Sequence, residues 1–405
     1  MLAASGCYDP TPPAGVPCGD NDVCPAGQTC IAGICEGSMD ADVVPDALST
    51  DAPLGCEAWQ AKHFTPCALP APMGDLQMIE SMSTYNWDTS SGVLKAKAGK
   101  VVPVATMIVQ QTGGPELLVA SVNNLTIDPQ VTLSIAGSRP LVFAVWGTAK
   151  IGGTIDGAAS YSVPGPGGVS STSTPYGCGS GPTGDSGASG TPATGGGGGG
   201  YQGVGGRGGN TGGLGGDALM PSLIIHGGCA GGSGGVGTST AGTRGAGGGA
   251  LQITAPTSIE ITTGAVIHMG GGGGSYGRAG YGGGGGGGTG GYIGLDAPQV
   301  TIAGTLAANG GGGGGGASDV ANGSSGGNAR ADGVAATGGA GATSTNVGAC
   351  GRGGSGGAGG TLGGATGGSS GCGGAGGGGA VGYILVWSPA LMVTGTVSPP
   401  AMSGP

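Results

Sequence analysis

The 405-residue sequence predicts an all-β fold, a β-solenoid whose coils are separated by glycine-rich excursions. Short apolar alternations, a corner and a glycine-led step recur in the same order in four segments: Pro140–Gly157, Leu251–Gly274, Tyr292–Gly316 and Tyr383–Pro399. The steps themselves fall at matching places: Gly153-Thr154-Ile155, Gly264-Ala265-Val266, Gly304-Thr305-Leu306 and Gly395-Thr396-Val397. Self-similarity built from short strands and corners is the signature of a solenoid.

Composition limits the kind of core that this chain can form. It has 108 glycines and 26 prolines, and a share of this size without a strict period is typical of disorder. No Gly-X-Y repeat is kept, which excludes collagen. Since 4% of the residues are aromatic and 8% are charged, the aliphatic residues of the repeated segments must build a thin core.

Residues 1–7 are interpreted as the remnant of a lipoprotein signal. Leu2–Cys7 resembles a lipobox, in which small residues precede a cysteine that is cut and acylated, although the upstream parts of a signal peptide are missing. Cys7 is therefore the expected lipidation site, and Tyr8, in place of an aspartate, favours the outer membrane. The alternative is a chance match, with Cys7 unpaired or paired differently.

Cysteine number supports an oxidising, extracytoplasmic compartment. The chain has 11 cysteines, so removal of Cys7 leaves an even set able to form five disulfides. Residues 8–35 form a cysteine-rich module, for which we expect the alternating pairs Cys18–Cys30 and Cys24–Cys35 among three possibilities. Zinc is disfavoured, because two close Cys-x-x-Cys pairs are lacking. The module resembles small EGF-like or Dickkopf-like modules of secreted bacterial lipoproteins.

The rest of the chain divides into a linker, a cap and the solenoid. Residues 36–55 are acidic and without periodicity, which indicates a solvated tether. Residues 56–75 contain Cys56 and Cys67, expected to pair, and are predicted to cap the open end of the solenoid with Trp59 and Phe64. Residues 76–400 are the solenoid, with first coils built from strands in 76–135.

The glycine-rich insertions span about residues 158–249, 270–290 and 310–380. Flexible loops are one alternative, because glycine has the most conformational freedom to lose on folding. The other is a set of polyglycine-II helices with three residues per turn, packed against one another. Expected disulfides within single insertions, Cys178–Cys229 and Cys350–Cys372, favour order.

Three short motifs carry a family resemblance: Tyr85-Asn86-Trp87-Asp88-Thr89, Arg139-Pro140-Leu141-Val142 and Gly153-Thr154-Ile155-Asp156-Gly157. They resemble the glycine-rich surface lipoproteins of the myxobacterial type. The resemblance covers most of residues 56–400. It implies a right-handed β-helix-like fold and a surface location, and it implies no catalytic residues.

Side chains that could carry chemistry are scattered along the chain. The coils hold one carboxylate each: Asp128, Asp156, Glu260 and Asp296. Their spacing, with or without Arg139, does not match that of a catalytic carboxylate site. The three histidines, His63, His226 and His268, do not have the spacing of metal ligands. A calcium nonapeptide match at Gly212–Leu219 occurs once, whereas that motif works in tandem. We therefore expect no enzymatic activity, no cofactor and no metal, and the lack of a basic, aromatic-rich patch argues against nucleic-acid binding.

These features predict a non-enzymatic, lipid-anchored structural or adhesion protein of the outer membrane or cell surface. Its partners would be the membrane, through the lipid, and a polysaccharide or another cell surface contacted by the glycine-rich face. Four tyrosines beside glycine tracts could stack on sugar rings: Tyr176, Tyr201, Tyr276 and Tyr281. The alternatives are a secreted β-helix polysaccharide lyase or hydrolase, and an ice-binding protein, for which Thr154, Thr305 and Thr396 supply one threonine per unit.

Overall fold

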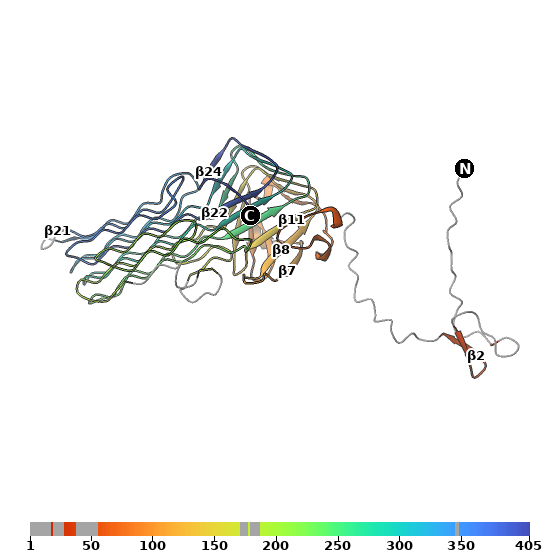
Figure 1. Ribbon diagram of the computed structural model, residues 1–405, viewed down its shortest axis with the longest axis horizontal. Coiled ribbons are helices and arrows are strands. Elements are labelled where there is room, and N and C mark those ends of the chain that lie inside the picture. The colour runs from red at the N-terminus through yellow and green to blue at the C-terminus, as the bar shows by residue number, and fades with distance from the viewer. Residues whose placement is uncertain (1–17, 19–27, 38–55, 171–176, 179–186, 345–347) are drawn as a thin grey trace. The chain divides into compact units, whose positions relative to one another are not determined.

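The structure is a computed structural model that describes residues 18, 28–37, 56–170, 177–178, 187–344 and 348–405 (Figure 1). The chain divides into two units, Met1–Asp51 and Ala52–Pro405. In the first unit, β1 (Gln28–Ile31) and β2 (Ile34–Gly37) form an antiparallel hairpin, and a disulfide joins Cys18 to Cys30. Cys7, Cys24 and the side chain of Cys35 lie outside the described residues, as does most of the expected linker.

The described part of the second unit is all-β and contains three large sheets. Sheet I consists of β24 (Thr396–Ser398), β19 (Thr305–Ala307), β16 (Val266–His268), β13 (Thr154–Asp156), β10 (Thr132–Ala136), β4 (Thr84–Asp88), β5 (Val93–Ala96) and β6 (Val101–Val102). Sheet II consists of β25 (Met402–Ser403), β22 (Tyr383–Trp387), β17 (Tyr292–Asp296), β14 (Ala250–Thr254), β11 (Leu141–Val145), β8 (Leu117–Val122) and β7 (Ala105–Val109). Sheet III consists of β23 (Ala390–Val393), β18 (Gln299–Ile302), β15 (Ser258–Ile261), β12 (Thr148–Ile151), β9 (Leu125–Ile127) and β3 (Leu76–Met78).

Short elements complete the unit. They are the 3-10 turns η1 (Cys56–Ala58), η2 (Pro66–Ala68), η3 (Glu80–Met82) and η4 (Lys97–Gly99), and the small hairpin of β20 (Thr343–Ser344) and β21 (Gly348–Ala349). From β8 onward, apart from the β20–β21 hairpin, successive strands join sheets II, III and I in turn. From β9 onward each of these strands pairs in parallel with an earlier strand of the same sheet. This order is compatible with a solenoid-like fold.

The N-terminal part of the unit differs from the expected first coils. Strand β5 pairs antiparallel with both β4 and β6, and β7 pairs antiparallel with β8. The prediction of solenoid coils throughout 76–135 was therefore wrong for these strands. Their apolar alternation is the same in parallel and antiparallel pairing, so the pattern identified the strands without identifying their partners.

The strands of sheet II from β8 to β22 are buried on both faces. One face contributes residues such as Phe143, Ile253 and Leu295 to the main apolar core shared with sheets I and III. The other face packs Val142 and Ala144 into a second cluster with aromatic residues. Strands buried on both faces lose the alternation of polar and apolar residues, which explains the continuous apolar run in β11.

Trp59 and Phe64 belong to this second cluster. Their rings lie edge to face with centroids 5.5 Å apart, and Trp59 also contacts Trp146, just after β11, at 4.9 Å. The cap segment, residues 56–75, therefore packs on the outer face of sheet II, and the expectation that it closes an open end was wrong. Its disulfide joins Cys56 to Cys67, the expected pair.

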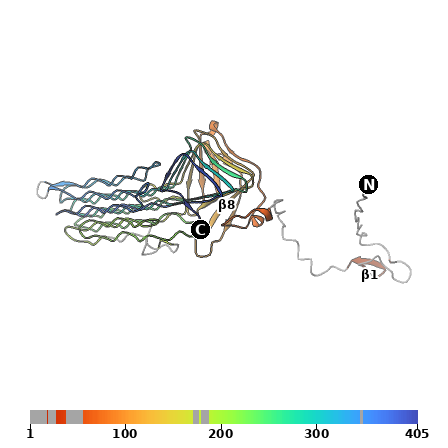
Figure 2. The same ribbon diagram turned by 45° about the horizontal axis from the view of Figure 1, so that its top comes forward.

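The glycine-rich segments extend together to one side of the three sheets, as Figures 1 and 2 show. Their backbones are hydrogen-bonded to one another with a repeat of three residues. In the run 310–316, successive N–H groups donate to three different neighbouring segments: Gly310 and Gly313 to Gly357 and Gly354, Gly311 and Gly314 to Gly288 and Gly285, and Gly312 and Gly315 to Gly327 and Ser324, at 2.8–3.0 Å. A repeat of three is that of an extended polyproline-II-type chain, which favours the packed alternative over flexible loops.

Disulfides lie within two of these insertions. Cys178 pairs with Cys229 and Cys350 with Cys372, which are the pairings that the sequence suggests. The first closes 51 residues, and in the chain-entropy view such a loop stabilises the fold by about 4 kcal/mol. Both bonds restrict segments that have few apolar side chains of their own.

Close approach of backbones explains why this bundle needs glycine. A Cβ atom at Gly198 would overlap the carbonyl oxygen of Gly378, and backbone cannot rotate away as a side chain can. We expect Gly198→Ala to lower the free energy of unfolding by about 1–3 kcal/mol, the usual loss on overpacking. The measurement is urea unfolding followed by tryptophan fluorescence.

Gly360→Ala is the matched control, because a Cβ at this exposed turn position meets no atom within 4 Å. Its stability should stay within about 0.5 kcal/mol of the parent chain. Equal losses for the two variants would contradict the close packing of the bundle.

Candidate functional site: a corner cavity beside Asp296

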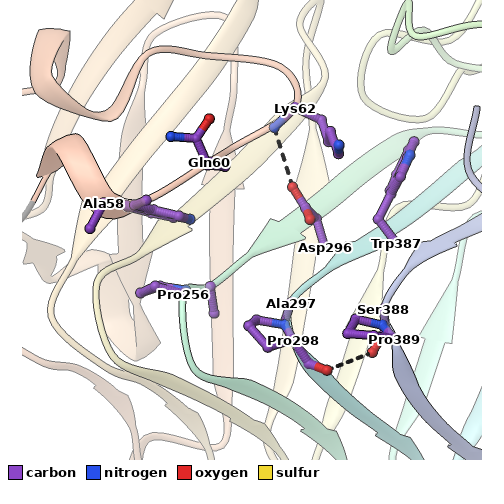
Figure 3. Close-up of a pocket in the computed structure, with 12 residues that line it drawn as sticks. Ala58, Gln60, Lys62, Pro256, Asp296, Ala297, Pro298, Trp387, Ser388 and Pro389 are labelled. Carbon is purple, nitrogen blue, oxygen red and sulfur yellow. Dashed lines mark hydrogen bonds between the residues drawn. The ribbon is translucent and has the colours of Figure 1, made fainter.

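A cavity of about 430 Å³ lies between the cap segment and three successive corners that connect sheets II and III (Figure 3). Its walls come from the cap segment and from the residues that end or follow β14, β17 and β22: Ala58, Trp59, Gln60, Lys62, Ala255, Pro256, Asp296, Ala297, Pro298, Trp387, Ser388 and Pro389. Residues far apart in the sequence thus meet here because the strands are stacked in register.

Proline forms the corner in all three rounds. Pro256, Pro298 and Pro389 each follow the end of a sheet II strand by two residues, and proline cannot donate a ladder hydrogen bond, so it favours a strand end. Parallel pairing places Asp296 beside both Thr254 and Trp387, so the three corners follow one another at the strand spacing of about 4.8 Å. The result is one apolar wall made of proline rings.

Asp296 provides the acidic group of the cavity. Asp296 is 8% exposed, and its Oδ2 accepts a hydrogen bond of 3.3 Å from the backbone N–H of Lys62 (Figure 3). Within the described residues it forms no ion pair shorter than 4.0 Å. Burial raises the pKa of Asp296, and the N–H and charge of Lys62 oppose this rise only in part. The carboxylate is therefore poorly compensated.

A buried polar network fastens the cap segment beside the cavity. Gln252 Nε2 donates to His63 Nδ1 at 2.8 Å and to Thr254 Oγ1 at 3.0 Å, while Gln252 Oε1 accepts from the hydroxyl of Tyr292 at 3.1 Å. The His63 ring also lies edge to face with Trp387 at 5.2 Å. Burial lowers the pKa of His63 to about 4, with a smaller opposing effect from the backbone of Leu223.

The other carboxylates singled out in the sequence are not brought to this cavity. Asp156 lies 3.5 Å from His268 and Glu260 lies 3.4 Å from Lys150, in pairs between neighbouring strands. Burial raises the pKa of Asp156, but hydrogen bonds from His268 and the Ala158 N–H outweigh burial and lower it. Asp128 follows β9 in sheet III. Only Asp296 lines the cavity.

The side chain of Arg139 holds two segments of the fold together. Its Nε donates to Glu116 at 2.8 Å, and its Nη1 donates to the carbonyl oxygens of Thr89 and Ser90 at 3.3 and 2.7 Å. The guanidinium thus ties the loop after β4 to the segment before β8. In the described part of the chain, no three metal-binding side chains gather to hold an ion.

The glycine-associated aromatic residues differ in accessibility. Tyr201 is 2% exposed and its hydroxyl donates to the carbonyl of His226 at 3.0 Å, so the expectation that it stacks on a sugar was wrong. The reason is that the outer face of sheet II recruits it into the second apolar cluster. Tyr276 and Tyr281 are half-buried, and Arg278 lies 5.7 Å from the ring of Tyr276. Tyr176 lies outside the described residues.

His226 is also buried, with Nδ1 2.7 Å from the carbonyl oxygen of Gly227, and burial lowers its pKa.

The sequence did not indicate Lys62, Gln60 or Trp387 as site residues. One signal could have indicated them in part: the corner dipeptides at 255–256, 297–298 and 388–389 repeat, and Trp387 precedes the last of them.

No helix among the described residues is long and apolar enough to cross a membrane. Comparison with known proteins finds no matching family model, no matching curated protein and no matching solved structure. The functional conclusion therefore depends on the residues of this chain.

Because its folded pKa lies below the model-peptide value of 6.5, His63 makes stability depend on pH. Between pH 6.5 and 4 the unfolded chain binds a proton that the folded chain does not, so stability falls as the pH falls. A pKa shift of this size corresponds to a loss of up to about 3 kcal/mol in the free energy of unfolding. Urea unfolding at pH 7 and pH 4.5 measures it.

His63→Gln is the test variant, because glutamine can accept from Gln252 without titrating. Its stability should depend less steeply on pH than that of the parent chain. Some slope must remain, because the pKa of His226 is lowered too. An unchanged slope in the variant would contradict the assignment to His63.

Proposed function

We propose that this chain is a non-enzymatic structural or adhesion protein of the cell surface. Its three sheets would be a right-handed β-solenoid, and its glycine-rich insertions would be a bundle of polyglycine-II helices presented to the surroundings. The threefold hydrogen-bonding repeat of the glycine tracts is the observation that carries this proposal. It gives the insertions a defined surface, which a binding face requires and flexible loops lack.

Chemical features of the bundle support an extracytoplasmic role. Two disulfides lie within it, and disulfides persist in oxidising compartments. Runs such as 195–200, 282–288 and 310–316 are buried inside the bundle, so the exposed residues around them form its outer surface. We propose a matrix polysaccharide or another cell surface as the partner of that outer surface.

Anchoring would come from the N-terminus. We propose that Cys7 carries the lipid and that residues 36–55 hold the folded unit off the outer membrane. Three acyl chains on a mature lipoprotein bind a bilayer firmly, whereas a single chain binds only marginally. An acidic tether remains extended because its charges repel one another.

Ice binding is a second candidate, favoured by one feature of sheet I. The first positions of its strands form a single column in which threonine recurs and Val266 is the one interruption: Thr84, Thr132, Thr154, Val266, Thr305 and Thr396. Threonines at the strand spacing of about 4.8 Å offer a regular row of hydroxyl and methyl groups. Thermal hysteresis of the purified chain would support this candidate, and its absence would remove it.

Anchoring is tested with Cys7→Ala expressed in the native host. We expect the parent chain to sediment with membranes and to carry acyl mass on Cys7, and the variant to be released. Ser49→Ala, in the proposed linker, should behave as the parent chain. An unmodified Cys7 in the parent chain would contradict anchoring.

Adhesion is tested with the double variant Tyr276→Ala/Tyr281→Ala on beads coated with the full chain. If these rings contact the polymer, binding of native matrix polysaccharide should weaken several-fold, because an aromatic contact contributes about 0.5–1.5 kcal/mol. Lys95→Ala, an exposed β5 position outside the glycine-rich segments, is the control. Equal binding by all three proteins would exclude these tyrosines from the contact.

A further inference from the structure

We propose that the corner cavity beside Asp296 binds an amino sugar, with the sugar's ammonium group against the Asp296 carboxylate. The cavity lies between the cap segment and the strand corners, and the proposal holds whether or not the glycine bundle binds a polymer. Three properties of the cavity carry it: a poorly compensated carboxylate, an apolar wall of proline rings, and polar side chains at its rim.

Charge is the first property. Asp296 is 8% exposed, and its hydrogen-bond partner is the neutral backbone N–H of Lys62. A carboxylate removed from water is unfavourable unless a cation compensates it. Lys62 is the nearest candidate within the chain, but it is exposed and its ammonium forms no ion pair with Asp296 within 4.0 Å. A bound ammonium group would supply the missing positive charge.

Shape is the second property. The 430 Å³ cavity falls within the usual range for sites that hold small molecules. Pro256, Pro298 and Pro389 form one wall, and Ala58 and Trp387 lie on opposite sides of the cavity in Figure 3. Trp59 and Trp387 both contribute indole surface, which attracts cations and packs well against C–H groups. A sugar ring offers such C–H groups on its face, next to its ammonium.

The rim is the third property, and it separates amino sugars from other cations. Exposed Gln60 is among the lining residues and its amide can bind hydroxyls, whereas the ammonium of exposed Lys62 competes with the ligand for Asp296. Ser388 is already engaged, since its Oγ donates to Pro298 and accepts from Ala390. A divalent metal ion would need several oxygen ligands, whereas Asp296 is the one carboxylate among the lining residues. The site therefore fits an organic cation that also carries hydroxyl groups.

Protonation of Asp296 would remove the attraction. Burial raises the pKa of this carboxyl, so binding should weaken at a higher pH than for an exposed aspartate as the solution is acidified. The titratable groups that interact electrostatically with it are Lys62 of the cap segment and Tyr292 of its own strand, while His63 of the cap segment is hydrogen-bonded to Gln252 on the neighbouring strand β14. The low pKa of His63 keeps that ring neutral until about pH 4.

Calorimetric titration of the full chain tests the proposal, with a glucosamine hexamer as the probe and the N-acetylglucosamine hexamer as its neutral counterpart. We expect the glucosamine hexamer to bind at least about tenfold more tightly, since one ion pair of about 1.4 kcal/mol corresponds to tenfold. Asp296→Asn should lose at least the same factor. Glu260→Gln, which removes a carboxylate that lies outside the cavity, should bind as the parent chain does.

Lys62→Ala gives a second, independent reading and keeps the test valid if Asp296→Asn fails to fold. Removal of a competing cation at the rim should strengthen glucosamine binding about two- to fivefold; a clear loss would overturn the proposal. Equal binding of both hexamers, or no binding of the glucosamine hexamer, would also overturn it. Tighter binding of Nα-acetyl-lysine methylamide than of glucosamine would overturn the assignment to a sugar.

Discussion

The close approach of glycine backbones is the constraint on which the bundle of this protein depends. At Gly198, Gly286 and Gly376 the space that a Cβ would occupy already contains a carbonyl oxygen from another segment. Removing the side chain lets each N–H reach a neighbour, and the threefold repeat directs successive N–H groups to different neighbours. Backbone hydrogen bonds thereby replace the apolar core that these segments lack, and they satisfy groups that would be costly to bury unpaired.

Sheet II connects this bundle to the rest of the unit. Its inner face completes the main apolar core, and its outer face contacts the cap segment together with Tyr201 and Ile225 from the first insertion. Each insertion leaves after a sheet I strand and returns at a sheet II strand, so the spacing of the strands also sets the spacing of the glycine segments. The order of the sheets thus determines how the bundle is assembled.

The same stacking explains the corner cavity. Parallel register aligns three proline corners, and the cap segment covers them from the side. Asp296 is buried at this junction because β17 lies between β14 and β22 within the sheet. A carboxylate at a regular strand end would ordinarily reach water. Here the backbone N–H of Lys62 is the hydrogen-bond donor, and no ion pair within 4.0 Å balances the negative charge among the described residues.

Local pattern was enough to identify the repeated strands, the proline corners and the glycine-led steps, because each depends on residues close together in the chain. Cysteine spacing likewise suggested the pairs Cys56–Cys67, Cys178–Cys229 and Cys350–Cys372. Only the tertiary structure decided that β7 pairs antiparallel with β8, that Trp59 lies on sheet II, that Tyr201 is buried and that Lys62 meets Asp296. These outcomes depend on packing between distant segments, and an apolar or aromatic residue matches many such partners equally well until the sheets are assembled.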